Sequence, residues 1–81
     1  MRARVFVTLK PSVFDPQGKT VTDALHTLGY STVKDVRQGK YFELTLDGDL
    51  SKAEAQSEVE RIAREVLTNP VIEEYRYSLE D

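Results

Sequence analysis

Hydrophobic residues along the chain follow two alternating periods. In residues 2–9, Val5, Val7 and Leu9 fall on one side of a period-two pattern, and the β-branched content predicts a strand. The same period predicts three further strands, over residues 32–37, 40–46 and 71–79.

Two segments between these strands repeat apolar residues every three to four positions, as an amphipathic helix does. Asp15 can cap the first helix and Pro16 suits its first turn, although Gly18 moves the expected start toward Thr20. Gly29 is placed to end this helix in a left-handed cap. Its apolar stripe is Val21, Ala24, Leu25 and Leu28.

The second helix has its own start and stop signals. Ser51 and Glu54 have the spacing of a capping box, and Asn69 with Pro70 should end the helix, with Asn69 acting as a cap. The expected buried stripe is Ala55, Val59, Ile62, Ala63 and Val66.

The resulting order, β-α-β-β-α-β, predicts an α+β domain with the ferredoxin-like split βαβ arrangement. In this fold two helices lie on one face of a four-stranded antiparallel sheet. Gln38-Gly39 would form the hairpin turn between the second and third strands. With 81 residues, we expect a single domain over residues 1–81.

The second face of the predicted sheet also carries large side chains. The alternating pattern directs Phe6 and Tyr41 away from the expected core. We therefore expect this face to be an interaction surface through which the chain oligomerises. A two-residue turn would place Val36 opposite Tyr41. Either Val36 belongs to this second face, or a bulge changes the register.

Charge and composition exclude several functions. The net charge is −3, with seven basic and four acidic residues in positions 1–46 and four basic and ten acidic residues in positions 47–81. The overall field does not favour nucleic acid. With no cysteine and one histidine, the chain lacks the ligands for thiolate or histidine-cluster metal sites. No apolar run is long enough to span a membrane, so we expect a soluble, cytoplasmic protein.

Three candidate chemistries are weak. Gly39-Lys40 alone is a poor phosphate loop, and the aromatic pattern near Tyr41 departs from an RNA-recognition motif because position 43 is Glu. His26 has no partners for catalysis, and adjacent acidic residues of the last strand point to opposite sheet faces. A small-molecule-binding regulatory domain of the ACT type, with the same topology, remains an alternative.

Four segments together resemble the PurS family, the small subunits of phosphoribosylformylglycinamidine synthase in purine biosynthesis. These are VFVTLKPSVFDPQG, the following ALHTLGY, DVRQGKYFEL and NPVIEEYRY. The resemblance covers essentially the whole chain at matching spacing. The second helix is its least specific part.

The resemblance implies a non-catalytic subunit of an ATP-dependent ligase of the glutamine amidotransferase class. The complex converts formylglycinamide ribonucleotide, glutamine and ATP to formylglycinamidine ribonucleotide, glutamate, ADP and phosphate. Such subunits form homodimers or tetramers that join a PurQ-type glutaminase to a PurL-type synthetase and support ammonia transfer. ATP and Mg²⁺ would be used by the synthetase, with no cofactor or metal in this chain.

The resemblance also suggests residues for the assembly interface, all within the matching segments. They are Asp15, Gln17, Arg37, Lys40, Tyr41, Glu73, Tyr75, Arg76 and Tyr77. The residues expected to be structural are Pro16, Gly18, Gly29, Gly39 and Asn69. For residues 15–18, capping the first helix and contacting the larger subunits remain equally open.

Overall fold

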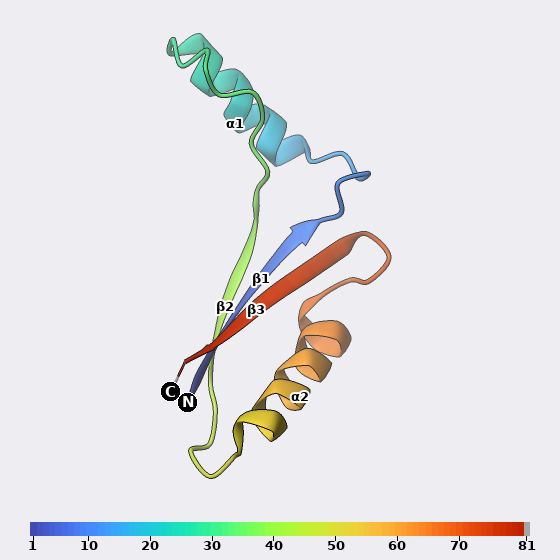
Figure 1. Cartoon of the computed structure of the whole chain (residues 1–81). Helices are drawn as coiled ribbons and strands as arrows, with labels where there is room; N and C mark the ends of the chain where they lie inside the picture. Colours follow the sequence, from blue (N-terminus) through green and yellow to red (C-terminus); the bar gives the residue numbers. More distant parts are fainter. Residues whose placement is uncertain (81) are drawn as a thin grey trace.

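Three strands and two helices follow one another in the computed structural model of the protein, which describes residues 1–80 (Figure 1). The elements in chain order are β1 (Arg2–Leu9), α1 (Pro16–Thr27), β2 (Gly39–Thr45), α2 (Lys52–Ile62), a π-helical turn η1 (Ala63–Leu67) and β3 (Glu73–Glu80). These helices and strands confirm the predicted α+β class. No helix among these residues has both the length and the apolar content needed to cross a membrane.

The strands form one antiparallel sheet in the order β2-β1-β3. Val5 pairs with Phe42 on one side and with Tyr77 on the other, so these three side chains share one face. The helix α2 lies on this inner face, where Val5, Val7 and Val59 are fully buried. Half-buried side chains of β2 and β3 surround this core: Phe42, Leu44, Tyr75, Tyr77 and Leu79.

The expected start of α2 is confirmed in detail. The Ser51 hydroxyl accepts a hydrogen bond from the Glu54 N–H, and the Glu54 carboxylate accepts one from the Ser51 N–H, each at 3.1 Å. These contacts hold the pKa of Glu54 below its usual value, chiefly through the Ser51 backbone bond. The capping box therefore satisfies two N–H groups that a helix start leaves free.

The buried stripe of α2 is correct as far as Ala63 and wrong at Val66. The last turn, η1, is π-helical, and its extra residue per turn shifts the phase of every later side chain. Val66 is consequently 74% exposed, and Leu67 packs against the core instead.

Val59→Ala is expected to lower the free energy of unfolding by about 2 kcal/mol, because it removes buried methyl groups and leaves a cavity. Val66→Ala makes the same chemical change about two turns later, at an exposed position. It should change stability by less than about 0.5 kcal/mol. Urea unfolding followed by circular dichroism measures both; equal losses would place the two valines in equivalent environments and contradict the π-helical phase shift.

The helix α1 begins at Pro16 rather than near Thr20, with Asp15 as its N-cap. It ends as predicted. Gly29 has φ of 98°, and the N–H of Tyr30 donates to the carbonyl of Leu25 while that of Gly29 donates to His26. This is a Schellman cap, which uses a glycine because the left-handed conformation is strained for other residues.

The predicted four-stranded sheet with two helices on one face is wrong for the single chain. Residues 33–38 are extended but belong to no sheet, and α1 points away from the strands (Figure 1). The radius of gyration is 16.1 Å, against about 12 Å for a compact domain of this length. The chain runs straight through Gln38-Gly39 into β2, so no hairpin forms there.

The role expected of Asn69 is also different. Its side-chain oxygen accepts a hydrogen bond from the Val71 N–H at 3.1 Å, and its carbonyl accepts bonds from Ile72 and Glu73. The α2–η1 helix has already ended at Leu67. Asn69 therefore turns the chain into β3 and does not cap the helix.

Candidate functional site

Residues from three segments that are far apart in the sequence meet at the N-terminal end of α1. We call this set the junction: Asp15, Gln17, Arg37, Gln38, Lys40 and Glu73. It joins the N-terminus of α1, the extended segment leading into β2, and the first residue of β3. Five of its six members belong to the interface residues suggested by the sequence.

Asp15 is the centre of the junction and is 5% exposed. One carboxylate oxygen accepts a hydrogen bond from the Gly18 N–H at 3.0 Å, and the other accepts one from the Gln38 N–H at 2.7 Å. The pKa of Asp15 lies below its ordinary value of 3.8. The largest cause is the bond from Gly18, followed by the bond from Gln38, and the nearby Arg37 guanidinium adds to the effect. One charged side chain thus caps α1 and fixes the chain that enters β2.

The other junction contacts tie the same segments together. The Arg37 guanidinium donates to the carbonyls of Val13 at 2.9 Å and Lys10 at 3.0 Å, both in the β1–α1 connection. The Gln38 side chain donates to Gln17 at 3.0 Å. The Lys40 ammonium lies 3.5 Å from the carboxylate of Glu73, linking β2 to β3.

Two glycines allow these segments to approach. A Cβ on Gly18 would collide with the carbonyl oxygen of Val36, and one on Gly39 would collide with the carbonyl oxygen of Val7. Gly39 was expected to make a hairpin turn, but Gly29 is the only described glycine with positive φ. Close approach to β1, rather than turning, is therefore what requires a glycine at position 39.

Asp15→Asn should weaken the acid dependence of folding. Because the folded-state pKa of Asp15 is lowered, its carboxylate stabilises the fold above pH 3.8, and this contribution disappears as pH falls through the lowered value. Asparagine replaces one of the two carboxylate oxygens with an NH2 donor, which would face the N–H of Gly18 or of Gln38. We expect a less stable protein at pH 7 and a shallower loss of stability as pH falls below 3.8.

Urea unfolding at a series of pH values measures this effect. Asp49→Asn is the control, because Asp49 is exposed and its carboxylate makes no hydrogen bond or ion pair within residues 1–80. Equal acid dependence in the Asp15→Asn and Asp49→Asn variants would rule out the stabilising role of the Asp15 carboxylate.

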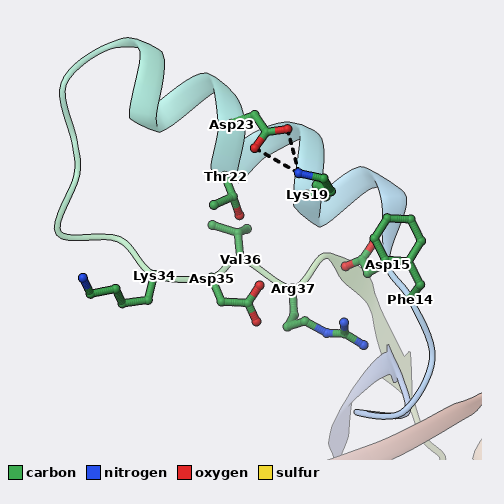
Figure 2. Close-up of a pocket in the computed structure, with 9 residues that line it drawn as sticks. All are labelled: Phe14, Asp15, Lys19, Thr22, Asp23, Lys34, Asp35, Val36 and Arg37. Carbon is green, nitrogen blue, oxygen red and sulfur yellow. Dashed lines mark hydrogen bonds and ion pairs between the residues drawn. The ribbon is translucent and has the colours of Figure 1, made fainter.

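A groove of about 250 Å³ lies beside the junction, between α1 and residues 34–37. Figure 2 shows Thr22 of α1 facing Val36 across it, with the Lys19–Asp23 pair on the helix side. That pair is 3.2 Å apart. Lys34 and Asp35 point away from α1 (Figure 2). The groove is open, and its lining contains no nucleophile or base held by a third group, so it does not resemble a catalytic site.

The outer face of the sheet, opposite α2, carries a second cluster. The rings of Phe6 and Tyr41 lie 5.1 Å apart, and the Arg76 guanidinium lies 5.0 Å from the centre of the Phe6 ring. The Tyr41 hydroxyl donates to Glu43; partial burial, followed by this bond, raises the pKa of Tyr41. Tyr41 and Arg76, both suggested as interface residues, are thus presented on an exposed and ordered surface.

Tyr75 and Tyr77 lie on the inner face instead. Both are half-buried against the core, and the Tyr77 hydroxyl donates to Glu60 of α2 at 2.6 Å. This bond is the main reason that the pKa of Tyr77 is raised. In the single chain, these two tyrosines hold α2 on the sheet.

The described residues contain no group of three or more side chains arranged to hold a metal ion. His26 Nε2 lies 2.7 Å from the carbonyl oxygen of Val33, and no acidic residue or hydroxyl within residues 1–80 bonds its ring. The side chains gathered at the junction bind one another and backbone groups. Their arrangement positions the chain segments that meet at the N-terminal end of α1.

Sequence reasoning missed Gln38 as a member of the junction. Gln38 was assigned to a turn, and its link to Asp15 spans 23 positions, so no local pattern reveals it. Phe6 was placed on the outer face by its alternation within β1, and the structure pairs it with Tyr41 there, but it was not among the suggested interface residues.

Comparisons with known proteins agree with one another. Residues 2–81 match the model of a family described as PurS, phosphoribosylformylglycinamidine (FGAM) synthase. The Bacillus subtilis FGAM synthase subunit PurS is 45% identical over 80 residues, covering 99% of this chain and 93% of that protein. The Synechocystis subunit PurS is 43% identical over 76 residues, covering 94% and 75%.

Solved structures give the same result. A crystal structure of Bacillus subtilis PurS has a TM-score of 0.85 at 45% identity and covers 99% of this chain and 98% of that one. Methanocaldococcus jannaschii PurS, one of the subunits of formylglycinamide ribonucleotide amidotransferase, has a TM-score of 0.86 at 32% identity, covering 99% and 95%. A chain in the structure of PurLQS from Thermotoga maritima has a TM-score of 0.86 at 31% identity, covering 95% and 93%.

Proposed function

The chain belongs to the PurS family of FGAM synthase subunits, and on this premise we propose that it bridges the other subunits of that ligase. It is a subunit of an enzyme of purine biosynthesis, and its own part is structural. The junction is the observation that carries the proposal. Its charged side chains hold chain segments together and do not form a catalytic arrangement.

The proposed partners are a PurL-type synthetase and a PurQ-type glutaminase. The Thermotoga maritima PurLQS structure, which includes a chain similar to this one, supports both assignments. In this proposal the glutaminase releases ammonia from glutamine, and the synthetase uses ATP and Mg²⁺ to activate formylglycinamide ribonucleotide. The present subunit holds the two together so that ammonia passes between them. The complex would work in the cytoplasm, where purine nucleotides are made.

Self-association is the second part of the proposal. Leu28 is 73% exposed and Tyr30 is 58% exposed, and α1 packs on no sheet within residues 1–80. Apolar surface of this kind on a small domain is usually covered by a partner. A homodimer, or a tetramer built from it, would cover it and would present two copies of each contact surface to the larger subunits.

An ACT-type regulatory domain is not favoured. The matched proteins described above are PurS subunits or a complex that contains one. The β1–α1 connection is also occupied by bonds from Arg37 to the carbonyls of Val13 and Lys10, which leaves it poorly suited to cradle a metabolite.

Reconstitution tests the bridging role. The synthetase and glutaminase subunits of the same organism are mixed with or without this chain, and FGAM formation is measured with glutamine and, separately, with ammonium chloride. We expect the omission to abolish glutamine-dependent synthesis and to leave ammonia-dependent synthesis largely intact. Unchanged glutamine-dependent synthesis without the chain would refute the bridging role.

A further inference from the structure

Two connections meet at the end of the sheet where β1 ends and β3 begins (Figure 1). The Lys10 N–H, in the β1–α1 connection, donates to the carbonyl of Ile72, just before β3, at 2.8 Å. We call residues 10–14 and 69–72 the loop end. Phe14, Val71 and Ile72 of the loop end are 67%, 77% and 39% exposed. Several large apolar side chains exposed on neighbouring connections of a small domain indicate a contact surface.

The loop end is nearly uncharged. Among its nine residues only Lys10 carries a charge, although 31% of the residues in the whole chain do. The central part of a protein–protein interface has the same kind of composition, in which charged residues are depleted and aromatic residues are enriched. The composition of the loop end therefore favours a buried contact over a solvated turn.

Hydrogen bonds around Asn69 fix the connection that presents Val71 and Ile72. The Asn69 side-chain oxygen accepts a bond from the Val71 N–H at 3.1 Å. The Asn69 carbonyl accepts bonds from the N–H groups of Ile72 and Glu73. The Asn69 N–H donates to the Glu73 carboxylate at 2.8 Å, and Pro70 restricts the backbone of the same turn. The two exposed side chains therefore project from a rigid turn.

The β1–α1 connection is held in the same way. The Val13 N–H donates to the Lys10 carbonyl at 2.8 Å, and the Arg37 guanidinium binds the carbonyls of both residues. Pro11 restricts the backbone between them. Because both connections are already ordered, the loop end would lose little conformational entropy when a partner binds it.

The loop end is separate from the side chains that we expect a second copy to cover. Leu28 and Tyr30 lie at the C-terminal end of α1, whereas Phe14 precedes its N-terminus. A helix of 12 residues is about 18 Å long, so these two places are far apart. Val71 lies in a different connection again. The loop end is therefore available to a partner other than a second copy.

We propose that the loop end is the surface on which this chain binds the glutaminase subunit. An apolar patch of that subunit packs against Phe14, Val71 and Ile72, and a carboxylate at the edge of the patch pairs with Lys10. This docking surface rests on the bridging role proposed above and specifies which part of the chain serves one of the two partners.

Charge favours the glutaminase over the synthetase. The synthetase of the proposed complex binds ATP and a phosphorylated ribonucleotide, and sites for such anions are surrounded by basic residues. A surface whose single charge is that of Lys10 would be repelled beside such a site. Positions 47–65, with six acidic and three basic residues, suit it better. Glutamine carries no net charge, so its enzyme does not require a basic surrounding.

Titration of the glutaminase into the assembled complex tests the docking surface. The synthetase is held at a fixed concentration with the parent chain or with Val71→Asp. Glutamine-dependent FGAM formation then gives the glutaminase concentration at half-maximal rate. We expect Val71→Asp to raise this concentration at least about 30-fold, as the loss of a central interface contact does. Capture of the synthetase by the tagged variant should stay within about twofold of the parent value, because the loop end does not contact it.

Phe14→Asp makes an equivalent change in the other connection and should raise the same concentration to a similar extent. Phe14 and Val71 are both exposed, so each variant should keep the fold of the parent protein, which circular dichroism measures. Val66→Asp is the matched control, because Val66 is 74% exposed but lies in η1, outside the loop end. We expect it to leave the half-maximal glutaminase concentration within about twofold.

The possible outcomes separate this docking surface from the bridging role. A half-maximal glutaminase concentration that neither Val71→Asp nor Phe14→Asp changes would overturn the docking surface, as would an equal effect of Val66→Asp. Loss of synthetase capture with an unchanged glutaminase requirement would assign the loop end to the synthetase and overturn the choice of partner. Glutamine-dependent synthesis that proceeds without any added chain would instead remove the bridging role itself.

Discussion

Gly18→Val should lower the free energy of unfolding by about 3 kcal/mol, at the upper end of the usual cost of overpacking. The first carbon of a side chain at this position would collide with the carbonyl oxygen of Val36 and lie 2.5 Å from the Asp15 carboxylate. The gain in helix propensity over glycine, below about 1 kcal/mol, is too small to compensate. The backbone of residues 36–38 must move, and the Asp15–Gln38 bond is lost with it.

Gly48→Ala is the matched control, because a Cβ there has no neighbour within 4 Å. We expect its stability to equal that of the parent protein or to exceed it by up to about 1 kcal/mol, since alanine restricts the unfolded chain. Urea unfolding measures both variants. If Gly18→Val proves as stable as Gly48→Ala, the close packing of α1 against residues 36–38 is incorrect.

Val21→Asp combined with Leu28→Asp should raise the dissociation constant of the homodimer by at least about 100-fold. Burying two such side chains contributes roughly 1.5–3 kcal/mol each, and each factor of ten in affinity corresponds to about 1.4 kcal/mol. Both residues are exposed in the single chain, so helix content measured by circular dichroism should be retained. The glutamine-dependent activity of the reconstituted complex should fall in parallel.

Val71→Asp tests whether this effect is specific to the apolar side chains of α1 and its C-terminal end. Val71 is 77% exposed and lies in the connection between η1 and β3, outside α1. We expect it to leave the dissociation constant measured by sedimentation velocity within about twofold of the parent value, as for a surface change away from the contact. If Val71→Asp dissociates the dimer and the double variant does not, the contact involves the connection between η1 and β3 and not α1.

Local patterns in the sequence predict those elements whose contacts are close along the chain. The capping box at Ser51 and the left-handed cap at Gly29 are satisfied within a few residues, and both are confirmed. Period-two alternation likewise predicts β1, β2 and β3. The failure at Val66 has a local cause, because one π-helical turn changes the phase of a stripe that was extrapolated at 3.6 residues per turn.

Residues 32–37 show why the rest of the fold could not be predicted from the sequence. Their β-branched pattern predicts a strand, but a strand forms only where an edge is available. Gln38-Gly39 has the composition of a hairpin turn, and the bonds that keep it straight come from Asp15 and from the β1–α1 connection, more than 20 positions away. A periodic pattern of apolar residues does not reveal contacts between residues so far apart in the sequence.

The candidate site was predicted in part. The motif segments name Asp15, Gln17, Arg37, Lys40 and Glu73, and the structure brings all five to the junction. The sequence predicts that Asp15 caps α1, but it does not reveal the bonds of Arg37 and Gln38 that orient the helix. Their function as an assembly interface stays a prediction.

The mass of the free chain in solution tests the proposed self-association most directly, because the exposed apolar side chains of α1 and its C-terminal end are expected to be covered by a second copy. Sedimentation equilibrium at several concentrations measures this mass without a label or a partner subunit. The account predicts twice the mass of the chain, or a higher even multiple, with dissociation only on dilution. The mass of a single chain at every concentration would contradict it.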